Sequence, residues 1–89
     1  MWSPPLTFLS TLALTFGTLQ ALANLPQAYR IYRRKSAKDV SFWTYAIFLV
    51  GSIIWVLYGL EIENPAVIIA NGVGILTLLA VLAGWLKYR

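Results

Sequence analysis

Cysteine and histidine are absent from this chain of 89 residues, and only three of its residues are acidic. Without cysteine the chain forms no disulfide bond, thiolate metal site or cysteine nucleophile. Without histidine it lacks the usual acid–base group at neutral pH and the commonest metal ligand. These absences argue against an enzyme and against a metal or cofactor site.

Charge of either sign is also scarce. Charged residues make up 11% of the sequence, against about 25% in a typical soluble domain. Apolar residues make up 60%, and the mean hydropathy is +0.72. The charged side chains fall in three short windows, 30–39, 61–63 and 87–89, and long apolar stretches separate them. This pattern is typical of a membrane protein and not of a soluble globular domain.

Each uncharged stretch is long enough to cross a membrane. The hydrocarbon core of a bilayer is about 30 Å thick, and about 20 residues of helix span it. The stretches predict helices at about 6–25, 42–60 and 65–86, within a single unit covering residues 1–89. They show no period-two alternation of the kind that barrel strands require. Because the backbone must satisfy its own hydrogen bonds in lipid, the sequence predicts an all-α integral membrane protein, a three-transmembrane-helix bundle.

Two other interpretations fit the sequence less well. A soluble bundle of three helices cannot bury stretches as uniformly apolar as these. A secretory signal peptide is suggested by Ala21-Leu22-Ala23, which looks like a cleavage site. However, no basic residue precedes Arg30, and the first apolar stretch exceeds the usual length of about 7–15 residues.

The basic residues predict how the chain is oriented in the membrane. Three spans place the segment 30–39 and the C-terminus on the same side, and all seven basic residues lie in these two places. Short basic segments stay in the cytoplasm, so the N-terminus is expected outside and the C-terminus inside. The excess positive charge then meets anionic lipid headgroups. Nucleic acid is not an expected partner, although the pI is about 9.8.

Two polar side chains inside the spans form a candidate binding pair. Trp55 lies about 6 Å and Asn71 about 7 Å from the centre of its span toward the outer side, so the two are expected at the same depth. An indole face can stack on the C–H face of a sugar ring, and a carboxamide both donates to and accepts from hydroxyl groups. The spacing fits equally well an Asn71 that bonds another helix and a Trp55 that faces lipid.

Two features of the first helix allow two interpretations each. Hydroxyl residues form a stripe that is either the polar wall of a cavity or a set of side chains bonded to the carbonyl four residues earlier: Thr7, Ser10, Thr11, Thr15 and Thr18. Asn24 and Gln27 flank Pro26, which marks either a hinge or the end of the helix.

Ionised side chains are missing from every predicted span. Carriers that couple transport to protons generally hold a carboxylate or a histidine within the membrane. Their absence favours passive transport of a neutral solute.

Several motifs together resemble one family of membrane transporters. They run through nearly the whole chain: Leu25-Pro26-Gln27, the basic segment, Val40-Ser41, Trp55-Val56-Leu57-Tyr58-Gly59 and Ile69-Ala70-Asn71. A lone Pro-Gln pair is common, but its combination with Trp-x-x-Tyr-Gly and an Asn twelve residues after that Gly is specific. The chain resembles the SemiSWEETs, the bacterial half-size relatives of the SWEET sugar transporters in the PQ-loop (MtN3/saliva) family.

The resemblance implies a fold and a set of roles. The three helices would have the spatial order 1-3-2, and two chains would form a parallel homodimer. Trp55 and Asn71 would bind the sugar, each contributed from both subunits. Pro26 and Gln27 would form the hinge for alternating access. Tyr58 would belong to the outer gate, without the Arg–Asp pair that some members have just past this tyrosine.

The leading hypothesis is therefore a facilitative carrier, a uniporter, for a small neutral mono- or disaccharide in the bacterial inner (plasma) membrane. Since three helices enclose too little volume for a sugar path, a homodimer is expected on size alone. Two other classes remain open. One is a PQ-loop carrier for an amino acid or another metabolite, which a buried carboxylate would favour. The other is a membrane adaptor subunit that transports nothing.

Overall fold

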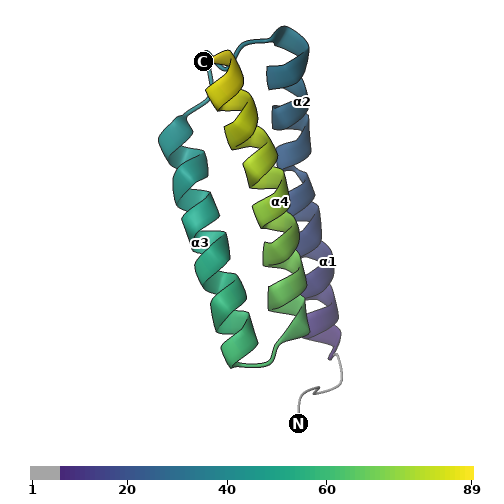
Figure 1. Cartoon of the computed structure of the whole chain (residues 1–89). Helices are drawn as coiled ribbons and strands as arrows, with labels where there is room; N and C mark the ends of the chain where they lie inside the picture. The colour runs from purple at the N-terminus through teal and green to yellow at the C-terminus, as the bar shows by residue number, and fades with distance from the viewer. Residues whose placement is uncertain (1–6) are drawn as a thin grey trace.

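The computed structural model describes residues 7–89, which form four α-helices. They are α1 (Phe8–Leu22), α2 (Asn24–Arg34), α3 (Phe42–Glu61) and α4 (Pro65–Tyr88), which Figure 1 shows as an elongated bundle. The helices predicted at 42–60 and 65–86 correspond to α3 and α4, which end one and two residues further on. The predicted start of the first helix at residue 6 lies outside the described residues.

The first span is longer than predicted. α1 and α2 follow one another with only Ala23 between them and make a helical span of 27 residues, Phe8–Arg34. The predicted end near residue 25 is therefore wrong, and Pro26 does not terminate the helix. Pro26 lies in the first turn of α2, where a backbone N–H has no partner within its own helix. The chain therefore continues as a helix beyond the proline.

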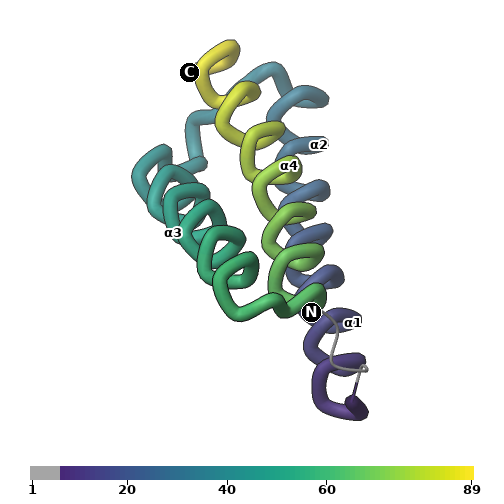
Figure 2. Tube along the Cα trace, turned by 60° about the horizontal axis from the view of Figure 1, so that its bottom comes forward, coloured from purple at the N-terminus to yellow at the C-terminus, as the bar shows by residue number. Residues whose placement is uncertain are grey.

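The break at Ala23 has a local cause. A proline nitrogen carries no hydrogen, so Pro26 cannot donate to the carbonyl of Leu22, four residues earlier, and its ring crowds that carbonyl. Ala23 keeps a right-handed conformation (φ −63°, ψ −16°), and no side chain caps the start of α2. The axes of α1 and α2 therefore point in nearly the same direction, and the two helices follow one another as a single span with a break at Ala23 (Figure 2).

Side-chain caps determine where α3 and α4 begin. The Ser41 hydroxyl accepts a hydrogen bond from the backbone N–H of Thr44 at 3.3 Å. Asn64 Oδ1 accepts from the N–H groups of Ala66 at 3.0 Å and Val67 at 3.3 Å. Such caps satisfy donors that have no partner within the first turn of a helix.

α4 lies at the centre of the bundle. It packs against α1, α2 and α3, whereas the backbone of α3 comes close to neither α1 nor α2 in the described part of the chain. A third of the α4 span (33%) is buried, against 6% for each of the other two spans. Figures 1 and 2 both show α4 between α3 and the α1–α2 pair. The third span thus lies between the first and the second, which is the order 1-3-2.

Small residues allow α4 to approach its neighbours closely. A Cβ atom added to Gly17 on α1 would lie 2.8 Å from the Cβ of Ala70 on α4. One added to Gly84 on α4 would lie 2.9 Å from Cγ2 of Ile31 on α2. An alanine at either glycine would therefore push two helices apart. Close approach of this kind is a principal source of helix association in lipid.

The outer surface of the bundle is apolar. Large hydrophobic side chains on all sides are mostly exposed, among them Phe16, Ile54 and Leu76. Three helical spans are long and apolar enough to cross a membrane. An exposed surface of this composition is stable against lipid hydrocarbon and not against water.

The charged residues lie at opposite ends of the bundle. The N–H of Ala37, in the segment after α2, donates to the carbonyl of Tyr88 at the end of α4 at 3.2 Å. This segment and the C-terminus therefore lie together (Figure 1). All seven basic residues of the chain belong to this end, which we call the basic end. Glu61 and Glu63 lie at the other end, by the turn between α3 and α4.

Candidate functional site

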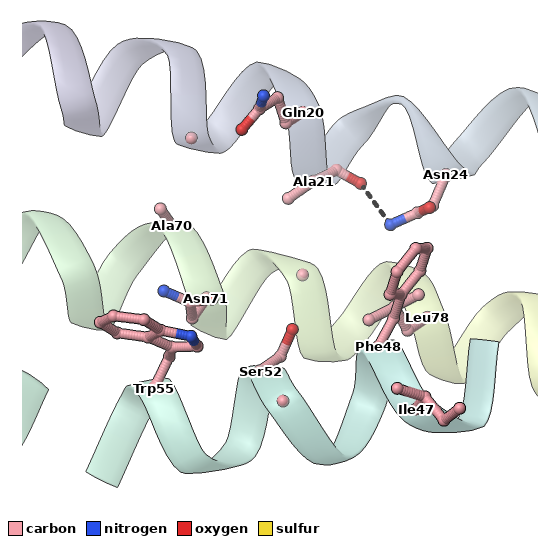
Figure 3. Close-up of a pocket in the computed structure, with 13 residues that line it drawn as sticks. Gln20, Ala21, Asn24, Ile47, Phe48, Ser52, Trp55, Ala70, Asn71 and Leu78 are labelled. Atoms are coloured by element: carbon pink, nitrogen blue, oxygen red, sulfur yellow. Dashed lines mark hydrogen bonds between the residues drawn. The ribbon is translucent and has the colours of Figure 1, made fainter. Parts of the chain in front are cut away.

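A pocket with a volume of about 580 Å³ lies among α1, α3, α4 and the first residue of α2, between the middle parts of the three spans. Pockets for small organic ligands range over about 300–1,000 Å³. The polar residues that line it are Gln20, Asn24, Ser52, Trp55 and Asn71 (Figure 3). The others are small or apolar: Gly17, Ala21, Ile47, Phe48, Gly51, Ala70, Gly74 and Leu78. None of the lining residues that the structure describes is charged.

Trp55 and Asn71, the pair selected from the sequence, line the same pocket. Figure 3 shows the indole of Trp55 reaching from α3 toward Asn71 on α4. The Trp55 side chain is 52% exposed and meets the Tyr58 ring edge to face, with 5.7 Å between the ring centroids. One face of the indole is therefore available to a ligand.

The Asn71 carboxamide bonds its own helix and not a neighbouring one. Its Nδ2 donates to the carbonyl of Val67 at 2.9 Å. This bond fixes the rotamer and uses one of the two N–H groups. Asn71 Oδ1 accepts no hydrogen bond from residues 7–89. An oxygen and one N–H thus remain for hydroxyl groups in the pocket.

Three polar lining residues were not selected from the sequence as binding residues. Gln20 and Asn24 are four residues apart, so they lie on one side of the first span, and both line the pocket. Ser52 comes from α3, one turn from Trp55 toward the basic end. The helical spacing of Gln20 and Asn24 is the signal that was available, since carboxamides three or four residues apart in an apolar span share a face.

The hydroxyl stripe on α1 does not form a wall of the pocket. Thr11 Oγ1 donates to the carbonyl of Thr7 at 2.8 Å, and Thr15 Oγ1 donates to that of Thr11 at 2.9 Å. Thr7 itself forms a capping box with Ser10 at the start of the helix. The hydroxyl groups of Thr7, Ser10, Thr11 and Thr15 therefore form hydrogen bonds within their own helix, as Ser and Thr side chains commonly do in membrane helices. Thr18, the other member of the stripe, does not line the pocket either.

A polar cluster joins the break in the first span to α4. Thr77, only 5% exposed, donates from Oγ1 to the carbonyl of Ala21 at 2.8 Å. Asn24 Nδ2 donates to the same carbonyl at 3.1 Å and lies 3.2 Å from Thr77 Oγ1. The Asn24 side chain thus belongs to the pocket wall and to the break at once. Thr77 Oγ1 also lies within donating distance, 3.1 Å, of the Gly74 carbonyl on its own helix. Its contacts with the first span could not be predicted from the sequence, because Ala21 and Asn24 are more than fifty residues away along the chain.

The remaining residues selected from the sequence lie outside the pocket. Pro26 and Gln27 are in the first turns of α2, just past the break at Ala23. Tyr58 is on α3, one turn beyond Trp55 toward the end opposite the basic end. The structure thus separates these three residues, selected as hinge and gate, from the pair selected for binding.

The fold and the pocket define the class of protein. A bundle of three membrane-crossing spans encloses an uncharged pocket with several hydrogen-bonding groups, and its outer surface suits lipid. This architecture is typical of a protein that carries a solute across a membrane. Among the pocket residues that the structure describes, none has a carboxylate, amine, imidazole or thiol.

Comparison with known proteins identifies the family. A family model described as "Sugar efflux transporter for intercellular exchange" matches residues 7–89. The sugar transporter SemiSWEET of Vibrio sp. (strain N418) is 31% identical over 78 residues, which cover 85% of this chain and 80% of the relative. The SemiSWEET of Bradyrhizobium diazoefficiens is 28% identical over 72 residues, which cover 81% and 84%. The crystal structure of a bacterial homologue of SWEET transporters matches with a TM-score of 0.87 and 28% identity, over 93% of this chain and 100% of that one.

The chain therefore belongs to the SemiSWEET and SWEET family of sugar transporters. The resemblance noted in the sequence is confirmed. The chain is a multi-pass membrane protein of a transporter family, and it is not an enzyme.

Proposed function

We propose that this protein is a uniporter that equilibrates a small neutral mono- or disaccharide across the bacterial inner membrane by alternating access in a homodimer. The observation that carries the proposal is the pocket, which brings the Trp55 indole and the Asn71 carboxamide together in a chain of this family.

Trp55 and Asn71 supply the two kinds of contact that a sugar ring needs. The exposed indole face stacks on the apolar C–H face of the ring. The Asn71 oxygen and its second N–H are free to meet hydroxyl groups, because only one N–H is bonded to Val67. Gln20 on α1 and Ser52 on α3 add further donors and acceptors to the pocket. Once a second subunit closes it, a site of this kind would reject ligands that leave its polar groups unpaired.

A second copy of the chain completes the path. A single chain has three spans, and its pocket is open on one side, where Trp55 remains half exposed. Two chains with parallel spans, related by an axis along the membrane normal, would face two such pockets toward one another. The sugar would then stack between two Trp55 rings and bond two Asn71 side chains.

The charge distribution supports an orientation with the basic end in the cytoplasm. All seven basic residues belong to that end, and short basic segments are retained inside. The N-terminus and the α3–α4 turn would then face outward. Tyr58 lies between the pocket and that turn, which suits a residue of the outer gate. Pro26 and Gln27 lie between the pocket and the basic end, which suits the hinge that opens the inner side.

The driving force would be the sugar gradient alone. No lining residue in the described part of the chain carries a carboxylate or an amine that could exchange a proton during transport. An uncoupled carrier needs only two conformations of similar energy and a ligand that binds both.

Vesicles containing the purified protein test the proposal. Labelled monosaccharides and disaccharides are expected to equilibrate down their gradients, and an imposed pH step is expected neither to drive accumulation nor to abolish equilibration. Uphill accumulation after the pH step would contradict uniport. Flux of amino acids without flux of sugars would identify a different PQ-loop carrier. No flux and no stabilisation by any solute would identify an adaptor.

A further inference from the structure

We propose that Asn24 couples the bound sugar to the angle between α1 and α2, and that Thr77 holds Asn24 in place when the pocket is empty. This inference rests on the proposed function. Asn24 is the first residue of α2, whereas the other residues that line the pocket belong to α1, α3 or α4. Within the described part of the chain it is therefore the one lining residue of the first span that lies beyond the break at Ala23. A ligand that contacts Asn24 contacts the inner half of that span.

Three helices meet beside Asn24. The carbonyl oxygen of Ala21 belongs to the last turn of α1, the Asn24 carboxamide to α2 and the Thr77 hydroxyl to α4. Thr77 Oγ1 lies 2.8 Å from the carbonyl oxygen, and Asn24 Nδ2 lies 3.1 Å from that oxygen and 3.2 Å from Thr77 Oγ1. We call these three contacts the clamp. Since a change in the angle between α1 and α2 moves Asn24 relative to Ala21 and to α4, the clamp stabilises the angle that this structure has.

The clamp can open without leaving a donor on α4 unpaired. Thr77 Oγ1 also lies 3.1 Å from the carbonyl oxygen of Gly74, on its own helix. The hydroxyl hydrogen of Thr77 therefore has two acceptors, Ala21 and Gly74, and keeps one of them when the first span moves. Thr77 loses only the bond that it accepts from Asn24, so opening avoids the large penalty of an unsatisfied buried donor.

A sugar in the pocket competes with Thr77 for Asn24. Asn24 Oδ1 accepts no hydrogen bond from residues 7–89, so it is available to a sugar hydroxyl. Oδ1 and Nδ2 belong to one planar group, so a ligand that turns the oxygen also turns the nitrogen. Sugar hydroxyl groups both donate and accept, and they replace the bond that Nδ2 loses. A ligand that binds the open clamp more tightly than the closed one shifts the equilibrium toward opening.

The clamp therefore restrains the empty carrier more than the loaded one. In a uniporter, exchange of sugar for sugar uses only transitions of the loaded carrier, whereas net flux also requires the empty carrier to return. A clamp that the sugar opens makes this return the slower step, so exchange is faster than net flux. At saturating sugar, the ratio of the two rates depends neither on affinity nor on the amount of folded protein.

The experiment measures this ratio in vesicles that contain wild type, Thr77→Val, Thr77→Ser or Asn24→Ala. Labelled glucose or sucrose is used, whichever the wild type transports, and exchange is measured with unlabelled sugar on the far side and net flux without it. Wild-type exchange is expected to be about fivefold faster than net flux, the factor that one net hydrogen bond corresponds to. Thr77→Val keeps the branched shape without the hydroxyl, so its ratio is expected to fall to near unity, as is that of Asn24→Ala. Thr77→Ser keeps the hydroxyl and is expected to keep the wild-type ratio.

Thr15→Val is the matched control. It makes the same substitution in the first span, where the Thr15 hydroxyl donates to the carbonyl of Thr11 on its own helix at 2.9 Å. Thr15 does not line the pocket. The variant is expected to keep the wild-type ratio, which separates the clamp from a general effect of removing a hydroxyl group within the membrane.

The role of Asn24 would be overturned by a wild type whose exchange and net flux are equally fast, because the empty carrier would then be unrestrained. It would also be overturned by a wild-type ratio in either Thr77→Val or Asn24→Ala, so one of these variants decides if the other does not insert. A ratio that falls equally in Thr77→Ser or Thr15→Val would show that the hydroxyl of the clamp is not the cause. A wild type that neither binds nor exchanges any sugar would instead contradict the proposed function, so the two failures are distinguishable.

Discussion

Asn24 and Thr77 meet at the break in the first span, where Asn24 Nδ2 lies 3.2 Å from Thr77 Oγ1 and both side chains donate to the carbonyl of Ala21. Pro26 creates the break, and these two side chains join it to the central helix α4. Because Asn24 also lines the pocket, a ligand that bonds its carboxamide oxygen acts on the same side chain that holds the break. Asn24 therefore belongs both to the pocket wall and to the hydrogen bonds at the break in the first span.

Thr77→Val is expected to destabilise the bundle by about 1 kcal/mol. The change keeps the branched shape but removes the hydroxyl that reaches the Ala21 carbonyl, and hydrogen bonds between membrane helices contribute on this order. Thermal unfolding in detergent measures the loss. Combining it with Asn24→Ala is expected to cost less than the two single losses together, because the two side chains share a partner. Strict additivity would show that the two side chains act independently.

Trp55→Ala and Asn71→Ala are each expected to weaken sugar binding. The first removes a stacking face that contributes about 1 kcal/mol, and the second leaves sugar hydroxyls unpaired at a cost of about 1–3 kcal/mol. Trp43 provides a matched control, since it is an exposed indole on α3 outside the pocket. Trp43→Ala is therefore expected to keep wild-type affinity. Titration of the three variants with the transported sugar measures their affinities. Unchanged affinity in both pocket variants would show that the sugar binds elsewhere.

Pro26→Ala is expected to slow the exchange between inward-open and outward-open states more than it weakens sugar binding. It restores a backbone donor for the Leu22 carbonyl and so stabilises an unbroken helix. A conformational equilibrium between two states of similar energy responds strongly to such a change. The measurement is the maximal rate of exchange in vesicles, compared with the affinity in a binding titration. Pro65→Ala, at the first position of α4, is the control and is expected to leave both unchanged. An equal loss of rate and affinity in Pro26→Ala would make the proline a structural element and not a hinge.

Removal of the basic residues after the break is expected to scramble the orientation of the chain. Positive charge near the ends of spans retains a segment in the cytoplasm, whereas acidic residues contribute little. Replacing all five basic residues of the 30–39 segment with Gln should therefore place some C-termini outside, which a C-terminal reporter detects. Glu61→Gln with Glu63→Gln should leave the orientation as it is. A C-terminus that stays wholly cytoplasmic in the first variant would show that other signals dominate.

The number of spans and their approximate limits follow from the sequence because they depend on local composition. The free-energy cost of placing a residue in lipid depends mainly on its own side chain. The uncharged stretches at 42–60 and 65–86 therefore predict membrane helices without any knowledge of the fold. Counting residues along two antiparallel spans also placed Trp55 and Asn71 at the same depth, but it left open whether both side chains face one pocket, which only the structure shows. The error at the end of the first span has a local cause too. A proline does not end a helix when the helix can restart with that proline in its first turn, as Pro26 does in α2.

What the tertiary structure decided is which residues from different spans meet. The contact of Asn24 with Thr77, the place of Gln20 and Ser52 on the pocket wall, and the open space over Gly51 all depend on how far the helices stand apart and how each is rotated about its axis. Those quantities come from side-chain packing against α4, where an added Cβ at Gly17 would meet Ala70 at 2.8 Å while one at Gly51 would meet nothing within 4 Å. Both residues are glycines in apolar helices, and only the packing of the helices separates a point of close contact from a point that leaves room for a ligand.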